Sequence, residues 1–129
     1  MQTSRTIVRS EQAPAPIGPY SQAVLAGNTL YVSGQIALDP STGALVNGSI
    51  EEETRQVMHN LSAILTAAGM TFANVAKSTI FIKNMGDFAR INAVYGEFFT
   101  ANPPARETVE VARLPKDVNI EISVIAILY

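Results

Sequence analysis

The chain has 129 residues, of which 47% are hydrophobic and only 16% are charged. A disordered chain combines low hydrophobicity with high net charge, so the composition excludes disorder, and the length predicts one domain spanning residues 1–129. The charged fraction lies below the roughly 25% that is usual for a soluble domain. We therefore expect a homo-oligomer, because a monomer with so few charges would expose a large apolar patch.

Charge and residue types exclude several classes of function. Nine basic and eleven acidic residues give a net charge of −2, whereas a nucleic-acid-binding surface carries an excess of positive charge. The chain has no cysteine and one histidine, His59, which excludes disulfides, thiolate nucleophiles and Cys- or His-rich metal sites. It also has no glycine-rich phosphate loop or dinucleotide motif. We therefore expect no nucleic-acid partner, no metal and no cofactor.

The first five residues are polar and lack the apolar segment of a signal peptide. The longest apolar run, residues 124–129, is too short to span a bilayer. These features predict a cytoplasmic protein without membrane association.

The order of the predicted elements follows from hydrophobic periodicity and from the positions of proline and glycine. In chain order, the sequence predicts a strand at 6–9, a stiff proline-rich loop at 13–20, strands at 22–25 and 30–33 joined by a Gly27-Asn28 hairpin turn, a turn at 39–43, a helix from the Ser49–Glu52 capping box to Gly69, a strand at 73–83, a helix from its cap Asp87 to before Asn102, and strands at about 106–112 and 120–128.

Two amphipathic helices on one face of a mostly antiparallel sheet make an α+β fold. The last predicted strand carries apolar side chains on both faces, with Ile122 and Val124 on one and Ile125 and Ile127 on the other. Because both helices cover one face, we expect a partner subunit to cover the second. A simple hairpin of the last two strands would place Glu110 opposite Glu121, and like charges there destabilise a sheet. These strands are therefore not expected to be neighbours.

Two residues are the leading candidates for chemistry. Glu121 lies on an apolar strand face, where a carboxylate needs a partner or a raised pKa. It is a candidate general acid or base, or alternatively one half of an interface salt bridge. Arg106 opens a strand with Thr108 on the same face, and its guanidinium is suited to bind a carboxylate through two hydrogen bonds. The alternative is a surface ion pair of little energetic value.

Four further residues are weaker candidates for a binding site. Tyr20 is presented by the proline-rich loop, although such a tyrosine is often only a packing residue. Ser33 ends a strand, and Gly34 beside it would let a ligand approach the backbone closely. Asn92 lies next to the apolar stripe of the second helix, where a buried amide must find partners. His59 is expected to be solvated and is given no role.

Several separated motifs occur together in an order typical of one family, namely residues 17–22 (IGPYSQ), 32–35 (VSGQ), 104–106 (PAR), 109–111 (VEV), 114–115 (LP) and 120–122 (IEI). With these motifs, essentially the whole chain resembles the RidA/YjgF family of reactive intermediate imine deaminases. The resemblance implies a chorismate-mutase-like α+β fold and a trimeric barrel with a site between each pair of subunits.

The resemblance also implies an activity and its residues. Family members of this type hydrolyse 2-aminoacrylate, 2-iminopropanoate and 2-iminobutanoate to 2-keto acids and ammonia without a cofactor. By this resemblance, Arg106 would bind the substrate carboxylate and Glu121 would activate water. The residues that would line the pocket are Tyr20, Ser33, Gly34, Asn92 and Thr108.

The sequence departs from the family pattern at three positions. Thr108 stands where many members have cysteine, Glu107 where serine is frequent, and Ser123 where a second glutamate is common. Thr108 keeps a hydrogen-bonding group, so we expect activity to survive, with changes at the pocket rim and in substrate preference. Two alternative functions are a non-catalytic trimer that binds 2-keto acids and regulates, and an endoribonuclease or translation inhibitor, which the net charge disfavours.

Overall fold

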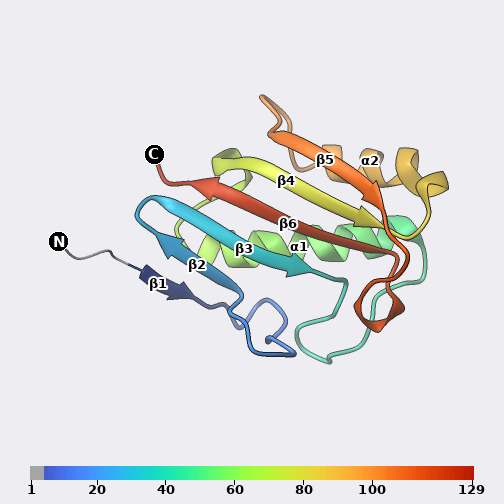
Figure 1. Cartoon of the computed structure of the whole chain (residues 1–129), viewed down its shortest axis with the longest axis horizontal. Coiled ribbons are helices and arrows are strands. Elements are labelled where there is room, and N and C mark those ends of the chain that lie inside the picture. The colour runs from blue at the N-terminus through green and yellow to red at the C-terminus, as the bar shows by residue number, and fades with distance from the viewer. Residues whose placement is uncertain (1–4) are drawn as a thin grey trace.

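The computed structural model describes residues 5–129 as a single six-stranded sheet with two helices on one of its faces (Figure 1). The strands follow one another across the sheet in the order β1-β2-β3-β6-β4-β5. The elements are β1 (Arg5–Val8), β2 (Ala23–Ala26), β3 (Thr29–Gln35), α1 (Ile50–Ala67), β4 (Val75–Ile82), α2 (Phe88–Gly96), β5 (Ala105–Glu110) and β6 (Ile120–Ile127), with short 3₁₀ turns at Phe72–Asn74, Met85–Asp87 and Pro115–Asp117. The predicted α+β fold is confirmed.

The last two strands are not neighbours, as the like-charge argument predicted. β6 lies between β3 and β4 and runs antiparallel to both, whereas β5 pairs only with β4 and runs parallel to it. A parallel pair needs a crossover connection, and α2 supplies it. Glu110 therefore pairs with Ile82, and Glu121 pairs with Phe81, so the two carboxylates are not opposite each other.

The core lies between the helices and one face of the sheet. Along β6, Ile120, Ile122, Val124 and Ala126 are buried and alternate with partly exposed residues, as expected for a strand with one covered face. They pack with the apolar stripe of α1, whose fully buried members are Val57, Met58, Leu61, Ile64 and Leu65. Burying each such side chain contributes about 1.5–3 kcal/mol, and this packing fixes the sheet that carries the candidate site.

The helix starts differ in part from the sequence prediction. Ser49 Oγ accepts a hydrogen bond from the Glu52 amide at 3.1 Å, so Ser49 caps α1 as predicted. The reciprocal bond of the predicted capping box, from the Ser49 amide to the Glu52 side chain, is not formed in the described part of the chain. Asp87 does not cap α2, and that prediction is wrong: Asn84 caps a preceding 3₁₀ turn instead. Asp87 consequently has helical backbone angles, whereas a capping side chain needs an extended backbone to reach the helix amides. Its carboxylate lies 3.8 Å from Arg90 Nη1.

The other face of the sheet has no helix on it among the described residues (Figure 1). Three large apolar side chains on its strands are about half exposed, namely Ile7 at 53%, Tyr31 at 51% and Val109 at 42%. Lys77 and Glu107 form an ion pair on the same face, with 3.2 Å between Nζ and Oε1. Lys77 is partly exposed in this pair. Within residues 5–129, no helix has the length and hydropathy needed to cross a membrane.

Candidate active site

The candidate residues form two groups on opposite faces of the sheet. Side chains of residues that pair across strands share a face. Arg106 pairs with Ser78, which pairs in turn with the buried Val124, so Arg106 faces the helices. Glu121 pairs with Phe81, whose other partner is the exposed Val109, so Glu121 belongs to the open face. We call the first group the arginine cluster and the second the glutamate pocket.

The arginine cluster holds the Arg106 guanidinium between β5 and α2. Its Nη1 donates a hydrogen bond of 2.7 Å to Oδ1 of Asn92, whose side chain is only partly buried. The guanidinium carbon also lies 5.1 Å from the centre of the Tyr95 ring and 5.6 Å from that of Phe88. Both distances are in the range of a cation–π interaction. Arg106 is therefore held by defined contacts and is not a free surface arginine.

Thr108 completes the arginine cluster. It lies two residues beyond Arg106 on the same face of β5. Its hydroxyl oxygen is buried and has no hydrogen-bond partner within the part of the chain that the structure describes. A buried polar atom without a partner costs about 1–3 kcal/mol, so a hydrogen bond from outside the described chain would stabilise this oxygen.

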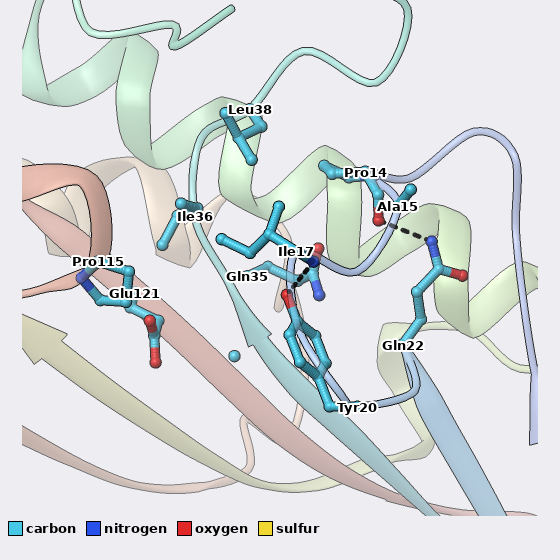
Figure 2. A pocket seen from close by; sticks show the side chains of 11 residues that line it. Pro14, Ala15, Ile17, Tyr20, Gln22, Gln35, Ile36, Leu38, Pro115 and Glu121 are labelled. Atoms are coloured by element: carbon cyan, nitrogen blue, oxygen red, sulfur yellow. Dashed lines mark hydrogen bonds between the residues drawn. The ribbon is translucent and has the colours of Figure 1, made fainter. Parts of the chain in front are cut away.

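The glutamate pocket lies where the start of β6 meets the proline-rich loop. Figure 2 shows Glu121 and Pro115 on one side of it and Ile17 and Tyr20 on the other. The cavity has a volume of about 50 Å³, and its remaining lining residues are Pro14, Ala15, Gln22, Gly34, Gln35, Ile36 and Leu38. Because Glu121 is half-buried among them, burial raises the pKa of its carboxyl above the ordinary value. This is the property expected of a general acid or base near neutral pH.

Gly34 lies directly beside the Glu121 carboxylate. A Cβ atom at residue 34 would lie 2.8 Å from Glu121 Cδ and closer still to Oε2. Gly34 and Ser33 occupy the irregular part of β3 between the pairs of Val32 and Gln35 with β6. The Ser33 hydroxyl donates to the Ser21 carbonyl at 2.6 Å. The sequence suggested that Gly34 lets a ligand approach the backbone closely. In the structure, the group that approaches the backbone of Gly34 is the Glu121 side chain.

The loop that carries Tyr20 is held by a residue that the sequence analysis did not single out. Gln22 is 3% exposed, and its side-chain amide donates to the carbonyls of Ser10, Ala13 and Pro14 while accepting from the Ser10 amide. Prolines leave the carbonyls of their loop short of backbone donors, so a glutamine directly after such a loop was the available signal. Tyr20 itself accepts a hydrogen bond from the Ile17 amide at 3.2 Å (Figure 2).

Two other buried polar residues connect the site to the helices. Tyr95 of α2 donates its hydroxyl to Ser78 Oγ at 2.8 Å. Glu53 of α1 is 1% exposed and accepts from both the backbone and the side-chain amide of Asn119, each at 2.8 Å. Asn119 directly precedes β6, so Glu53 fixes the start of the strand that carries Glu121. His59 is exposed, as predicted, and its ring meets the edge of Phe98.

The two groups have complementary chemistry. The arginine cluster offers guanidinium N–H groups and a threonine hydroxyl, which suit a carboxylate with a neighbouring polar group. The glutamate pocket offers one acid with a raised pKa and apolar walls. Among the described residues, no three His, Cys, Asp or Glu side chains are grouped to hold a metal ion.

Known proteins resemble this chain over nearly its full length. The family model described as Endoribonuclease L-PSP matches residues 10–128. A RutC family protein of Pyrococcus horikoshii is 54% identical over 122 residues, which are 95% of this chain and 97% of that protein. The human 2-iminobutanoate/2-iminopropanoate deaminase is 47% identical over 123 residues, covering 95% of this chain and 90% of that protein.

A solved structure also agrees with the fold. The crystal structure of Escherichia coli TdcF with bound serine superposes with a TM-score of 0.92 at 42% identity, covering 96% of this chain and 99% of that one. The family match spans more than nine-tenths of the sequence, and the motifs around Tyr20, Gly34, Arg106 and Glu121 all lie within it. The chain therefore belongs to the RidA/YjgF family, the family described by the Endoribonuclease L-PSP model.

Proposed function

We propose that the protein hydrolyses reactive 2-imino acids, and the enamines that tautomerise to them, to 2-keto acids and ammonia. The proposed substrates are small: 2-aminoacrylate with its tautomer 2-iminopropanoate, and 2-iminobutanoate. One observation carries the proposal. The chain combines an arginine, Arg106, that is held in place by other side chains with a separate acid, Glu121, whose pKa is raised by burial. The resemblance to a human protein named for this activity supports it.

Arg106 is proposed to bind the substrate carboxylate. One of its N–H groups is engaged by Asn92, and a guanidinium has five N–H donors in a planar fork that fits a carboxylate. Lysine cannot reproduce this arrangement, because its ammonium is a point charge. The unpartnered Thr108 hydroxyl lies on the same face of the strand and is proposed to contact the same ligand.

Glu121 is proposed to activate the attacking water. The water oxygen adds to C2 of the protonated imine while Glu121 accepts a proton from it, which forms a 2-amino-2-hydroxy acid. Glu121 then returns the proton to the nitrogen, the C–N bond breaks, and the hydroxyl oxygen becomes the keto oxygen. Both protons of the water end on the departing ammonium. Because the iminium carbon is already electrophilic, positioning and one proton carrier are sufficient.

We propose further that each complete site forms between two copies of the chain in a homotrimer. Arg106 and Glu121 face opposite sides of the same sheet, so side chains of one sheet cannot bring them together. The half-exposed Ile7, Tyr31 and Val109 give the open face the apolar character of a subunit interface. A second copy that covers this face would bring its own arginine cluster toward the glutamate pocket.

The experiment is a coupled deaminase assay. A threonine dehydratase generates 2-iminobutanoate, and its disappearance is followed with and without the protein. We expect acceleration over buffer, a loss of at least about 100-fold in Arg106→Ala and Glu121→Gln, and little recovery in Arg106→Lys. The matched control is Arg55→Ala, which removes an exposed arginine paired with Glu97 on the helices.

The other outcomes identify the alternative functions. No acceleration by the wild-type protein, together with 2-oxobutanoate binding that depends on Arg106, would indicate a ligand-binding trimer without turnover. Cleavage of RNA that survives Arg106→Ala and repeated chromatography would indicate a nuclease. Deamination by Arg106→Ala at the wild-type rate would overturn the assignment of the carboxylate to Arg106.

A further inference from the structure

We propose that Tyr95 is a positioning residue that fixes the plane of the Arg106 guanidinium, so that the edge of the guanidinium is presented to a carboxylate. This inference rests on the proposed function, because it assumes that Arg106 is the carboxylate-binding group. The guanidinium makes two kinds of contact in the arginine cluster: it donates a hydrogen bond at its edge to Asn92 Oδ1, and it lies near two aromatic rings of α2. We assign the decisive restraint to Tyr95.

Tyr95 is held more firmly than the arginine that it contacts. Its side chain is 6% exposed, and its hydroxyl donates to Ser78 Oγ at 2.8 Å. Ser78 is completely buried and pairs directly with Arg106 across β4 and β5. The Tyr95 ring is thus fixed to the strand next to the one that carries Arg106. Burial also raises the pKa of Tyr95, so its hydroxyl remains a neutral donor.

The geometry of a guanidinium explains why such a ring matters. An arginine side chain has four rotatable bonds and loses about 2 kcal/mol of rotamer entropy when it is ordered. An aromatic ring that holds a guanidinium by a cation–π interaction accepts no conventional hydrogen bond from it, so the N–H groups remain free for a carboxylate. The Tyr95 ring centre lies 5.1 Å from the guanidinium carbon, nearer than the 5.6 Å of Phe88. Tyr95 can therefore order Arg106 before a ligand arrives without competing for its donors.

The chain offers a matched control in Phe99. Its ring packs against Tyr95 with 4.8 Å between centroids and belongs to an aromatic group with Phe72. Arg106 has its cation–π contacts with Tyr95 and Phe88 in the described structure and has none with Phe99. Phe99→Leu therefore removes an aromatic ring from the same packing group, whereas Tyr95→Leu also removes the ring at the guanidinium.

The test measures 2-oxobutanoate affinity by NMR titration, the kinetic constants of deamination, and the Arg106 Nε–Hε signal of the assembled protein. We expect Tyr95→Leu to weaken 2-oxobutanoate binding and to raise KM about tenfold, with kcat changed less than about twofold. The Arg106 signal should lose its ring-current shift and broaden. Tyr95→Phe, which keeps the ring, should recover affinity to within about threefold of wild type.

The control and the second readout decide the outcome. Phe99→Leu should change affinity less than twofold, and an effect equal to that of Tyr95→Leu would overturn the inference in favour of general loosening of α2. An Arg106 Nε–Hε signal that is the same in Tyr95→Leu as in the wild type would also overturn the inference. So would a wild-type protein that does not bind 2-oxobutanoate. A wild-type protein that binds 2-oxobutanoate through a Tyr95-dependent Arg106 but turns over no imine would refute the proposed function alone.

Discussion

Gly34 and Glu121 are in such close contact that no larger residue fits at position 34 without moving the acid. A Cβ atom there would lie 2.8 Å from Glu121 Cδ and 3.0 Å from Cγ, both shorter than ordinary contacts. The two residues come from β3 and β6, which are adjacent in the sheet. The close approach therefore sets the position of the carboxylate in its pocket.

Gly34→Ala should separate activity from stability. The carboxylate is the end of a flexible side chain and can move away, so we expect a cost of less than about 1 kcal/mol in the free energy of unfolding. The displaced acid should lower kcat by roughly 10- to 100-fold, because a misplacement of about 1 Å costs that much. The measurements are urea unfolding and the coupled deaminase assay. Gly96→Ala is the control, since an added Cβ there meets no atom within 4 Å, and an equal kcat loss in that variant would contradict the argument.

Glu121→Gln should stabilise the protein while it abolishes activity. Burial raises the pKa of Glu121 in the folded state, so the unfolded chain ionises first as the pH rises. Below about pH 4, near the ordinary glutamate pKa, Glu121 is protonated in both the folded and the unfolded chain. The wild type is then not destabilised by a buried charge. As the pH rises through the raised pKa, the wild type loses stability relative to the variant, and the loss is complete above it.

Glu121→Gln should therefore be more stable than the wild type at pH 7, by a small margin because a half-exposed carboxylate keeps part of its hydration. Thermal unfolding of both proteins at pH 4 and pH 7 measures it, with the exposed Glu11→Gln as a control for lost charge. For the wild type, kcat/KM should fall on the acid side as the pH drops through the raised pKa of Glu121. The stability difference between Glu121→Gln and the wild type should increase from pH 4 to pH 7. A difference that decreases over this range would contradict the burial argument.

The sequence allowed most of the elements to be predicted, because hydrophobic periodicity and turn residues act locally. The hairpin at Gly27-Asn28 and the helix between Ser49 and Gly69 are examples, since each is determined by residues within a few positions. Asp87 failed as a cap because its backbone angles depend on Asn84 and the turn before it. Asn and Asp are about equally good cap residues, so the residue pattern does not decide between Asn84 and Asp87.

The arrangement of the site could be predicted only in part. Alternation along one strand placed Arg106 with Thr108, and like-charge repulsion separated the last two strands correctly. That Arg106 and Glu121 face opposite sides depends on the order β6-β4-β5 and on the parallel pair in it. Tyr95 and Gln22 were not singled out, because their contacts join different segments that are 8 to 12 residues apart and leave no periodic trace in a single sequence.

Gln22→Leu should detach the proline-rich loop from the sheet. The substitution keeps the volume but leaves the Ser10 amide and the carbonyls of Ser10, Ala13 and Pro14 without their partner. We expect a loss of about 2–4 kcal/mol in the free energy of unfolding and a raised KM, because Tyr20 belongs to this loop. Urea unfolding and hydrogen exchange of residues 10–20 measure the two effects. Gln12→Leu, at an exposed position directly before this loop, should have neither effect.

Mixing two inactive variants tests whether a site is shared between copies. Arg106→Ala retains the glutamate pocket, and Glu121→Gln retains the arginine cluster, each on its own face of the sheet. If a site joins Arg106 of one copy to Glu121 of the next, unfolding and refolding an equal mixture should restore about a quarter of the wild-type activity, because random assembly makes one interface in four fully wild type.

A site within one chain predicts no recovery in the mixture, because every chain would carry one defect. Sedimentation of the refolded mixture checks that mixed oligomers have formed, and the double variant Arg106→Ala/Glu121→Gln mixed with either single variant is the negative control. Oligomers that mix freely and remain inactive would refute the shared site. A recovery that scales with the product of the two variant fractions would show that the acid and the arginine act across a subunit interface, because only that arrangement needs one chain of each kind.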